Sequence, residues 1–120
     1  MSNETELMQL WTRHLRLNLL TVMSELPAGR GNLHLLGEAA GMRGTLGSSD
    51  QARMALDWLA EQGLVATVAS DVWELTEKGQ EVVEHRSIVP GVQRPPRRWR
   101  TRRAPAAPPT AAARAPAAFR

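Results

Sequence analysis

The sequence contains no cysteine, which excludes disulfide bonds and thiolate metal sites. No apolar run approaches the ~20 residues that a membrane-spanning helix requires. The first ten residues, MSNETELMQL, are acidic and polar, whereas a secretory signal peptide begins with a basic region. We therefore expect a cytoplasmic protein that has no membrane segment.

Acidic residues are missing from the last part of the chain. Residues 1–86 hold all 12 Asp and Glu against 7 Lys and Arg, a net charge of −5. Residues 87–120 hold 8 arginines and no acidic residue, a net charge of +8. A chain of 120 residues has room for one small domain. The charge division predicts an acidic folded domain with a basic arm suited to a polyanion or an acidic protein face.

A long first helix is predicted over residues 4–26, which contain good helix formers and no Gly or Pro before Pro27. One apolar stripe on this helix consists of Met8, Trp11, Leu15, Leu19, Val22, Met23 and Leu26. A second stripe consists of Leu7, Leu10, Leu17 and Leu20. A helix that is apolar on two sides has to bury both. We therefore predict a homodimer formed through this helix.

Two shorter helices follow. Residues 32–42 predict a helix with Asn32 as its N-cap. After a glycine-containing loop, residues 48–62 predict a third helix, capped by Ser48 or Ser49 and ended by Gly63 at the C′ position.

The periodicity changes after the third helix. Residues 64–69 and 72–76 are rich in β-branched and apolar residues and are separated by a two-residue turn, which predicts an antiparallel hairpin. Thr76 is placed to cap a last short helix. The predicted fold class is therefore α+β, with three helices, a two-stranded hairpin and a short C-terminal helix within residues 4–87. Residues 88–120, the C-terminal arm, are rich in Arg, Pro and Ala, and we expect the arm to be disordered.

This order of elements is typical of a winged helix-turn-helix. The segments LAEQGLV and WELTEKG resemble the helix–wing region of bacterial regulators of the MarR and ArsR kind. From about Leu10 onward, the chain is similar to a family of small ArsR-like winged-helix proteins of Mu-like transposable phages and prophages. The ending of that family is matched by Val89, Pro90, Gly91, Val92, Arg94 and Pro95. The resemblance implies a winged-helix fold in a host cytoplasm, and the extension after Pro96 departs from it.

A DNA-binding winged helix inserts its third helix into the major groove and contacts the backbone with its wing. Candidate base-reading residues are Ser49, Gln51 and Arg53, and Arg43 is a candidate phosphate contact. Candidates in the arm are Arg94, Arg97, Arg98, Trp99, Arg100, Arg102 and Arg103. The arginines suit phosphates and Trp99 suits stacking on a base. The leading hypothesis is a phage or prophage protein, a regulator or accessory factor, that binds double-stranded DNA, with non-specific phosphate contacts from the arm.

The alternative hypothesis is a protein-interaction module that no longer binds DNA and targets a host or phage protein. The third helix carries three acidic residues against one arginine, and the hairpin tip, Ser70 and Asp71, contains no basic residue. On this interpretation the candidate residues of the helix are ordinary solvated side chains. The arm is then a low-complexity extension that folds back on its own acidic domain, or it docks on an acidic partner.

The sequence offers little for catalysis or cofactor binding. His14, His34 and His85 lack the HxxxH or HxH spacing of a metal site. No nucleophile–base pair, paired catalytic carboxylates or phosphate-binding loop with its lysine can be assembled. We therefore expect a protein that is not an enzyme and that holds no metal or cofactor.

Overall fold

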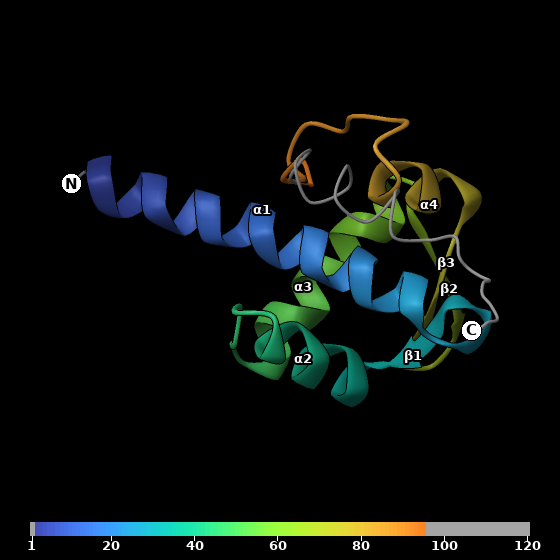
Figure 1. The fold of residues 1–120 in the computed structure, drawn as a ribbon. Helices are drawn as coiled ribbons and strands as arrows, with labels where there is room; N and C mark the ends of the chain where they lie inside the picture. The colour runs from blue at the N-terminus through green and yellow to red at the C-terminus, as the bar shows by residue number, and fades with distance from the viewer. Residues whose placement is uncertain (1, 96–120) are drawn as a thin grey trace, which may run out of the picture.

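The structure, a computed structural model, describes residues 2–95 of the chain. This part forms a mixed α+β fold with four α-helices and a three-stranded antiparallel sheet (Figure 1). The helices are α1 (Ser2–Glu25), α2 (Leu33–Met42), α3 (Ser49–Glu61) and α4 (Glu77–Val83). The strands are β1 (Arg30–Asn32), β2 (Val65–Ala69) and β3 (Val72–Leu75), and a 3-10 turn, η1 (Pro27–Gly29), precedes β1. The predicted α+β class is confirmed.

The second half of α1 forms the centre of the core. Leu15, Leu19, Leu20 and Met23 are buried there, and α2, α3, α4 and β3 all contact α1. Each such aliphatic side chain contributes about 1.5–3 kcal/mol when it is fully removed from water. Figure 1 shows that the N-terminal turns of α1 project beyond the rest of the domain. The helix therefore has a packed second half, whereas its residues 3–10 are exposed and have no partner among residues 2–95.

The ends of α3 follow the sequence prediction closely. Ser48 is the N-cap: its side chain accepts a hydrogen bond from the Gln51 amide at 3.1 Å, and the Gln51 Oε1 accepts one from the Ser48 amide at 2.9 Å. This reciprocal capping box satisfies two amides that the helix itself leaves unpaired. Gly63, with φ of 80°, takes the left-handed conformation that ends the helix.

The other two predicted caps are also confirmed. The Asn32 Oδ1 accepts a hydrogen bond from the Leu35 amide at 2.8 Å at the start of α2. The Thr76 Oγ1 accepts one from the Gly79 amide at 3.1 Å at the start of α4. Both residues have extended backbone angles, so each turns the chain from a strand into a helix.

The sheet has one strand more than the sequence predicted. The predicted hairpin is present as β2 and β3, and β1 pairs antiparallel with the other edge of β3, which gives the order β1-β3-β2. Trp73 in the central strand is 2% exposed. The prediction of a two-stranded unit was wrong because β1 has only three residues, RGN, and shows no apolar alternation. The segment becomes a strand because it pairs with β3.

The second apolar stripe of α1 was expected to face another chain, but half of the stripe is covered by the chain itself. Leu17 and Leu20 are buried within the chain itself, because its own elements cover α1 from residue 15 onward. Leu7 and Leu10 are 64% and 37% exposed. The unpartnered apolar surface is therefore shorter than the sequence stripe, and it lies in the projecting half.

The packed chain extends beyond the predicted domain boundary at residue 87. Val92 is buried at 6% exposure, and the Gln93 amide donates a hydrogen bond to the Arg13 carbonyl at 3.2 Å. Residues 88–95 therefore belong to the folded part instead of the arm. Their packing depends on residues of α1 and α3 far away in sequence, which a local composition argument does not detect.

Replacing either of two helical glycines by alanine should change the free energy of unfolding, but in opposite directions. A Cβ at Gly79 would overlap the Leu64 carbonyl oxygen, whereas a Cβ at Gly37 would meet only the Ala52 methyl at 3.6 Å. We expect Gly79→Ala to lower the free energy of unfolding by about 1–3 kcal/mol through overpacking. Gly37→Ala should raise it by about 0.5–1 kcal/mol, because alanine favours the helix. Urea unfolding followed by circular dichroism measures both, and a loss of stability in Gly37→Ala would contradict the packing described.

Candidate nucleic-acid interface

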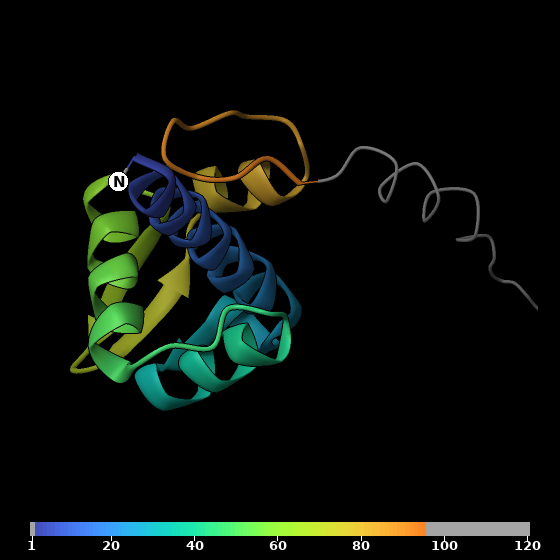
Figure 2. The same ribbon diagram turned by 90° about the vertical axis from the view of Figure 1, so that its left-hand side faces the viewer.

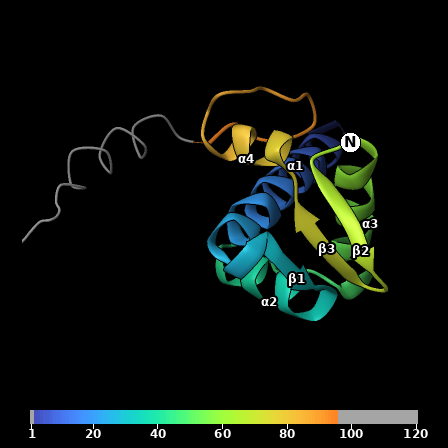
Figure 3. The same ribbon diagram turned by 90° about the vertical axis from the view of Figure 1, so that its right-hand side faces the viewer.

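The exposed side of α3 and the tip of the β2–β3 hairpin form one surface. The Arg53 Nη2 lies 2.7 Å from the Asp71 Oδ1, and both side chains are about half exposed. Asp71 has a positive φ of 60° in the turn, a conformation that Asp tolerates better than most residues. In Figures 2 and 3, α3 and the hairpin lie side by side on the same side of the domain. The ion pair thus joins the helix to the hairpin tip.

Ser49 and Gln51 lie in the first turn of α3. Ser49 is exposed and Gln51 is half-buried. The Gln51 Oε1 is used by the capping box, whereas its Nε2 has no partner among the described residues. Amide N–H groups and a positive helix dipole are concentrated at this end of α3. The first turn therefore presents hydrogen-bond donors, which suit acceptors on a base edge or a phosphate.

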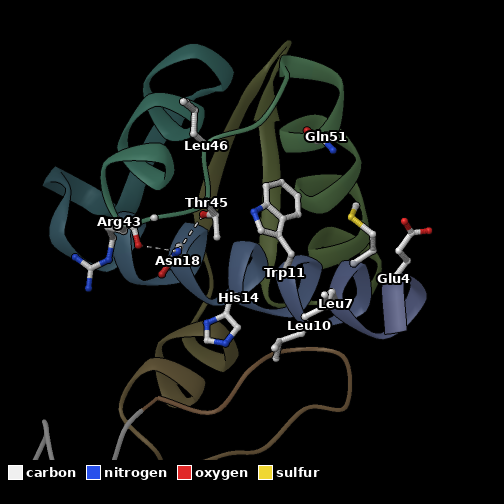
Figure 4. A pocket seen from close by; sticks show the side chains of 12 residues that line it. Glu4, Leu7, Leu10, Trp11, His14, Asn18, Arg43, Thr45, Leu46 and Gln51 are labelled. Atoms are coloured by element: carbon white, nitrogen blue, oxygen red, sulfur yellow. Dashed lines mark hydrogen bonds between the residues drawn. The ribbon is translucent and has the colours of Figure 1, made fainter. Parts of the chain in front are cut away.

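Arg43 does not join this surface. It is the C-cap of α2, and its Nη1 lies 3.9 Å from the Glu25 Oε2 at the end of α1. The loop after it is held on α1 by Asn18, whose Nδ2 donates to the Thr45 Oγ1 at 3.0 Å. Figure 4 shows Arg43 across a groove from Gln51. Of the four candidates in the domain, Ser49 and Arg53 thus share a face of α3, whereas Gln51 faces the groove that it lines with Arg43.

The electrostatics of this surface are unfavourable for a polyanion. Arg53 is paired with an acid, and the exposed Asp50, Asp57 and Glu61 lie on the same helix. Residues 2–95 contain 8 basic and 12 acidic residues, a net charge of −4. Because most protein–DNA contacts are made to phosphates, the domain alone supplies few of the contacts that drive affinity.

A clamp fixes the segment around Gly91, which precedes the arm, to α1 and α3. The Arg16 guanidinium lies 3.8 Å from the ring centroid of Trp58, and its Nη1 donates to the Gly91 carbonyl at 2.9 Å. Burial lowers the pKa of Arg16 below its ordinary value, and the ring face and the carbonyl compensate for the lost water. Gly91 has a φ of 97°, and a Cβ there would lie 2.8 Å from Trp58. Only glycine fits this position without strain.

Sequence reasoning did not identify Arg16 and Trp58 as partners of the segment around Gly91. The available signal was the glycine in VPGV, because a glycine in a short apolar motif often marks a close approach of the backbone. The two partners lie 75 and 33 residues away in sequence, so no local pattern connects them.

The arm leaves the domain far from α3. Arg94 is exposed at the end of the described chain. Figures 2 and 3 show residues 88–95 passing α1 and α4; this segment touches α3 where Gly91 meets Trp58, and the described chain then ends away from α3. The remaining candidates lie outside the described residues; they are Arg97, Arg98, Trp99, Arg100, Arg102 and Arg103.

Few other side chains in residues 2–95 are grouped in a way that could bind or react with a ligand. No group of three or more His, Cys, Asp or Glu side chains there is arranged to hold a metal ion. His34 lies 3.8 Å from Glu38 on the exposed side of α2. No helix in this part of the chain combines the length and the apolar character needed to cross a membrane.

Comparisons of the chain with protein-family models, with curated proteins and with solved structures found no match.

The clamp can be tested by replacing its arginine. In Arg16→Ala we expect amide hydrogen exchange of Val92 and Gln93 to accelerate about tenfold or more, because the cation–π contact and a charged hydrogen bond are lost. Arg13→Ala is the matched control, since Arg13 contributes only its backbone carbonyl to this segment. Unchanged protection in Arg16→Ala would show that the clamp does not hold residues 88–95.

Proposed function

We propose that this chain is a winged-helix protein of phage or prophage origin that binds double-stranded DNA as a regulator or accessory factor. The order α1-β1-α2-α3-β2-β3 and the sheet order β1-β3-β2 are typical of a winged helix. In such proteins the third helix enters the major groove and the wing touches the backbone. The observation that carries the proposal is this order of elements, which sets α3 beside the hairpin tip on one surface.

The C-terminal arm supplies most of the affinity in this proposal. Residues 96–120 contain seven arginines and no acidic residue, which offsets the negative charge of the domain. Five of these arginines are concentrated in residues 97–103, and Trp99 among them can stack on a base. Because the described chain ends away from α3, the arm contacts phosphates outside the segment of groove that faces α3.

Removal of the arm after residue 95 tests this division of roles. The full chain should bind a random duplex with a slope of log K against log salt that is steeper by about 4 to 5 than that of residues 1–95, because about five phosphate contacts are lost. Fluorescence anisotropy at several salt concentrations measures both slopes. Equal slopes for the two proteins would exclude the arm as the source of phosphate contacts.

The second candidate function is a protein-interaction module that does not bind DNA. It is favoured by the acidic residues on α3 and by the pairing of Arg53 with Asp71. In that case, α3 and the hairpin tip form a surface for a basic or mixed-charge protein partner, and DNA does not contact this surface.

A single substitution separates the two functions. Asp71→Asn removes a negative charge and releases Arg53, so DNA affinity should rise about three- to tenfold if α3 faces the groove. Glu81→Gln, which removes the same charge from α4 at the end of the domain away from the hairpin tip, is the matched control and should have a smaller effect. Equal effects of the two substitutions would mean that DNA responds only to net charge and does not contact α3.

A further inference from the structure

The projecting half of α1 carries an apolar surface without a partner in the described chain. Every residue from 3 to 10 is exposed, and Leu15 is the first buried residue of the helix. Leu7 and Leu10 lie on this half, beside a groove of about 860 Å³ whose far wall includes Leu46, itself 77% exposed (Figure 4). A helix end without tertiary contacts is marginally stable in water, and burial of its apolar face would stabilise it.

The sequence of this half has the spacing of a coiled-coil seam. Asn3, Leu7, Leu10 and His14 recur at intervals of four, three and four residues, which places them along one line of the helix. All four are exposed. The stripe ends at the point where α1 enters the domain, so the seam is limited to about two heptads.

Two charged residues flank this seam on the same side. Glu6 and Arg13 are seven residues apart, so both occupy the position just before a seam residue. Neither makes a side-chain hydrogen bond or an ion pair with any other described residue. Unpaired charges of opposite sign at equivalent positions are suited to meeting across an interface between two copies.

We propose that this half of α1 pairs antiparallel with α1 of a second copy, in the register that places Leu7 opposite Leu10 of that copy. In an antiparallel helix pair, a residue just before a seam residue on one helix faces the equivalent position on the other helix. The two are displaced by about half a turn along the helix axis. In this register, Glu6 of each copy faces Arg13 of the other. The pairing is isologous, so two Glu6–Arg13 contacts form about a two-fold axis.

The other antiparallel registers are excluded by charge and by space. A shift of one heptad in one direction places Arg13 opposite Arg13, and a shift in the other places Glu6 opposite Glu6. The first shift would also drive the start of one helix against residues 17–21 of the other, where the domain already covers α1. The proposed register ends with Asn3 opposite His14, just before the buried Leu15. The overlap therefore matches the exposed length, about 20 Å of helix.

A parallel pair would not use these charges. In parallel coiled coils, each of these flanking residues faces the position five residues further along its partner, which is Trp11 for Glu6 and Asn18 for Arg13. Both charges would remain unpaired. Charge complementarity thus selects the antiparallel arrangement. This pairing of two copies does not depend on whether the protein binds DNA.

Charge reversal with rescue is the decisive experiment on the full chain. We expect the wild-type protein to form a concentration-dependent dimer in sedimentation equilibrium. Glu6→Arg and Arg13→Glu should each raise the dimer dissociation constant about tenfold, because two attractive contacts become repulsive. The double variant restores both contacts and should return to within about threefold of the wild-type value. Circular dichroism at low concentration checks that each variant remains folded.

Several results would overturn the inference. A wild-type protein that is monomeric up to its solubility limit would leave this surface to a different partner. A double variant as weak as, or weaker than, the two single variants would exclude the proposed register. The apolar seam has its own control: Leu7→Ser should weaken the dimer, whereas Leu35→Ser, at an exposed leucine of α2, should not. Equal weakening by both would point to non-specific association. None of these measurements involves DNA, so their failure is distinct from failure of the proposed function.

Discussion

The fold depends on the unequal burial of one helix. From Leu15 onward, α1 is the element on which α2, α3, α4 and the central strand of the sheet all pack. Residues 3–10, which precede the partly buried Trp11, are all exposed, although apolar residues continue among them. A single helix therefore provides both the centre of the core and an apolar surface that has no partner among residues 2–95. The clamp around Arg16 lies on α1 as well, so the segment that precedes the arm is fixed to the same element.

Charge is divided between the parts of the molecule in a way that constrains function. The packed residues are net acidic, and the acids pair with the few arginines that α2 and α3 present. The positive charge is concentrated after residue 95. In the proposed function, the domain offers a helix and a hairpin tip of defined geometry for recognition, and the arm offers charge for affinity. Affinity from such an arm is sensitive to salt, whereas recognition by the domain is sensitive to individual side chains.

Sequence reasoning succeeded where the determinants are local. Asn32, Ser48, Gly63 and Thr76 act within four residues of themselves, and each ends or begins a helix as predicted. The strand β1 could not be predicted in this way, because three residues with a central glycine become a strand only through pairing with β3, about forty residues later. The same limit applies to Leu17 and Leu20, since periodicity gives the face of a helix but not the chain that covers it.

The candidate site shows the same limit. The positions of Ser49, Gln51 and Arg53 on α3 followed from helix spacing, whereas the ion pair of Arg53 with Asp71 depends on how the hairpin folds back beside α3. The packing of residues 88–95 likewise needs Arg16 and Trp58, which lie on different helices. Long-range contacts of this kind determine which candidate side chains are available to a ligand. Composition alone had assigned residues 88–95 to the arm.

The central claim is that DNA meets the surface made by α3 and the hairpin tip. It is tested most directly by nuclear magnetic resonance of the isotopically labelled full chain, titrated with a short duplex. The account predicts that backbone amide shifts change at Ser49, Gln51, Arg53 and Asp71 as well as in the arm. Shifts confined to residues after 95, or no shifts at any concentration of duplex, would contradict it.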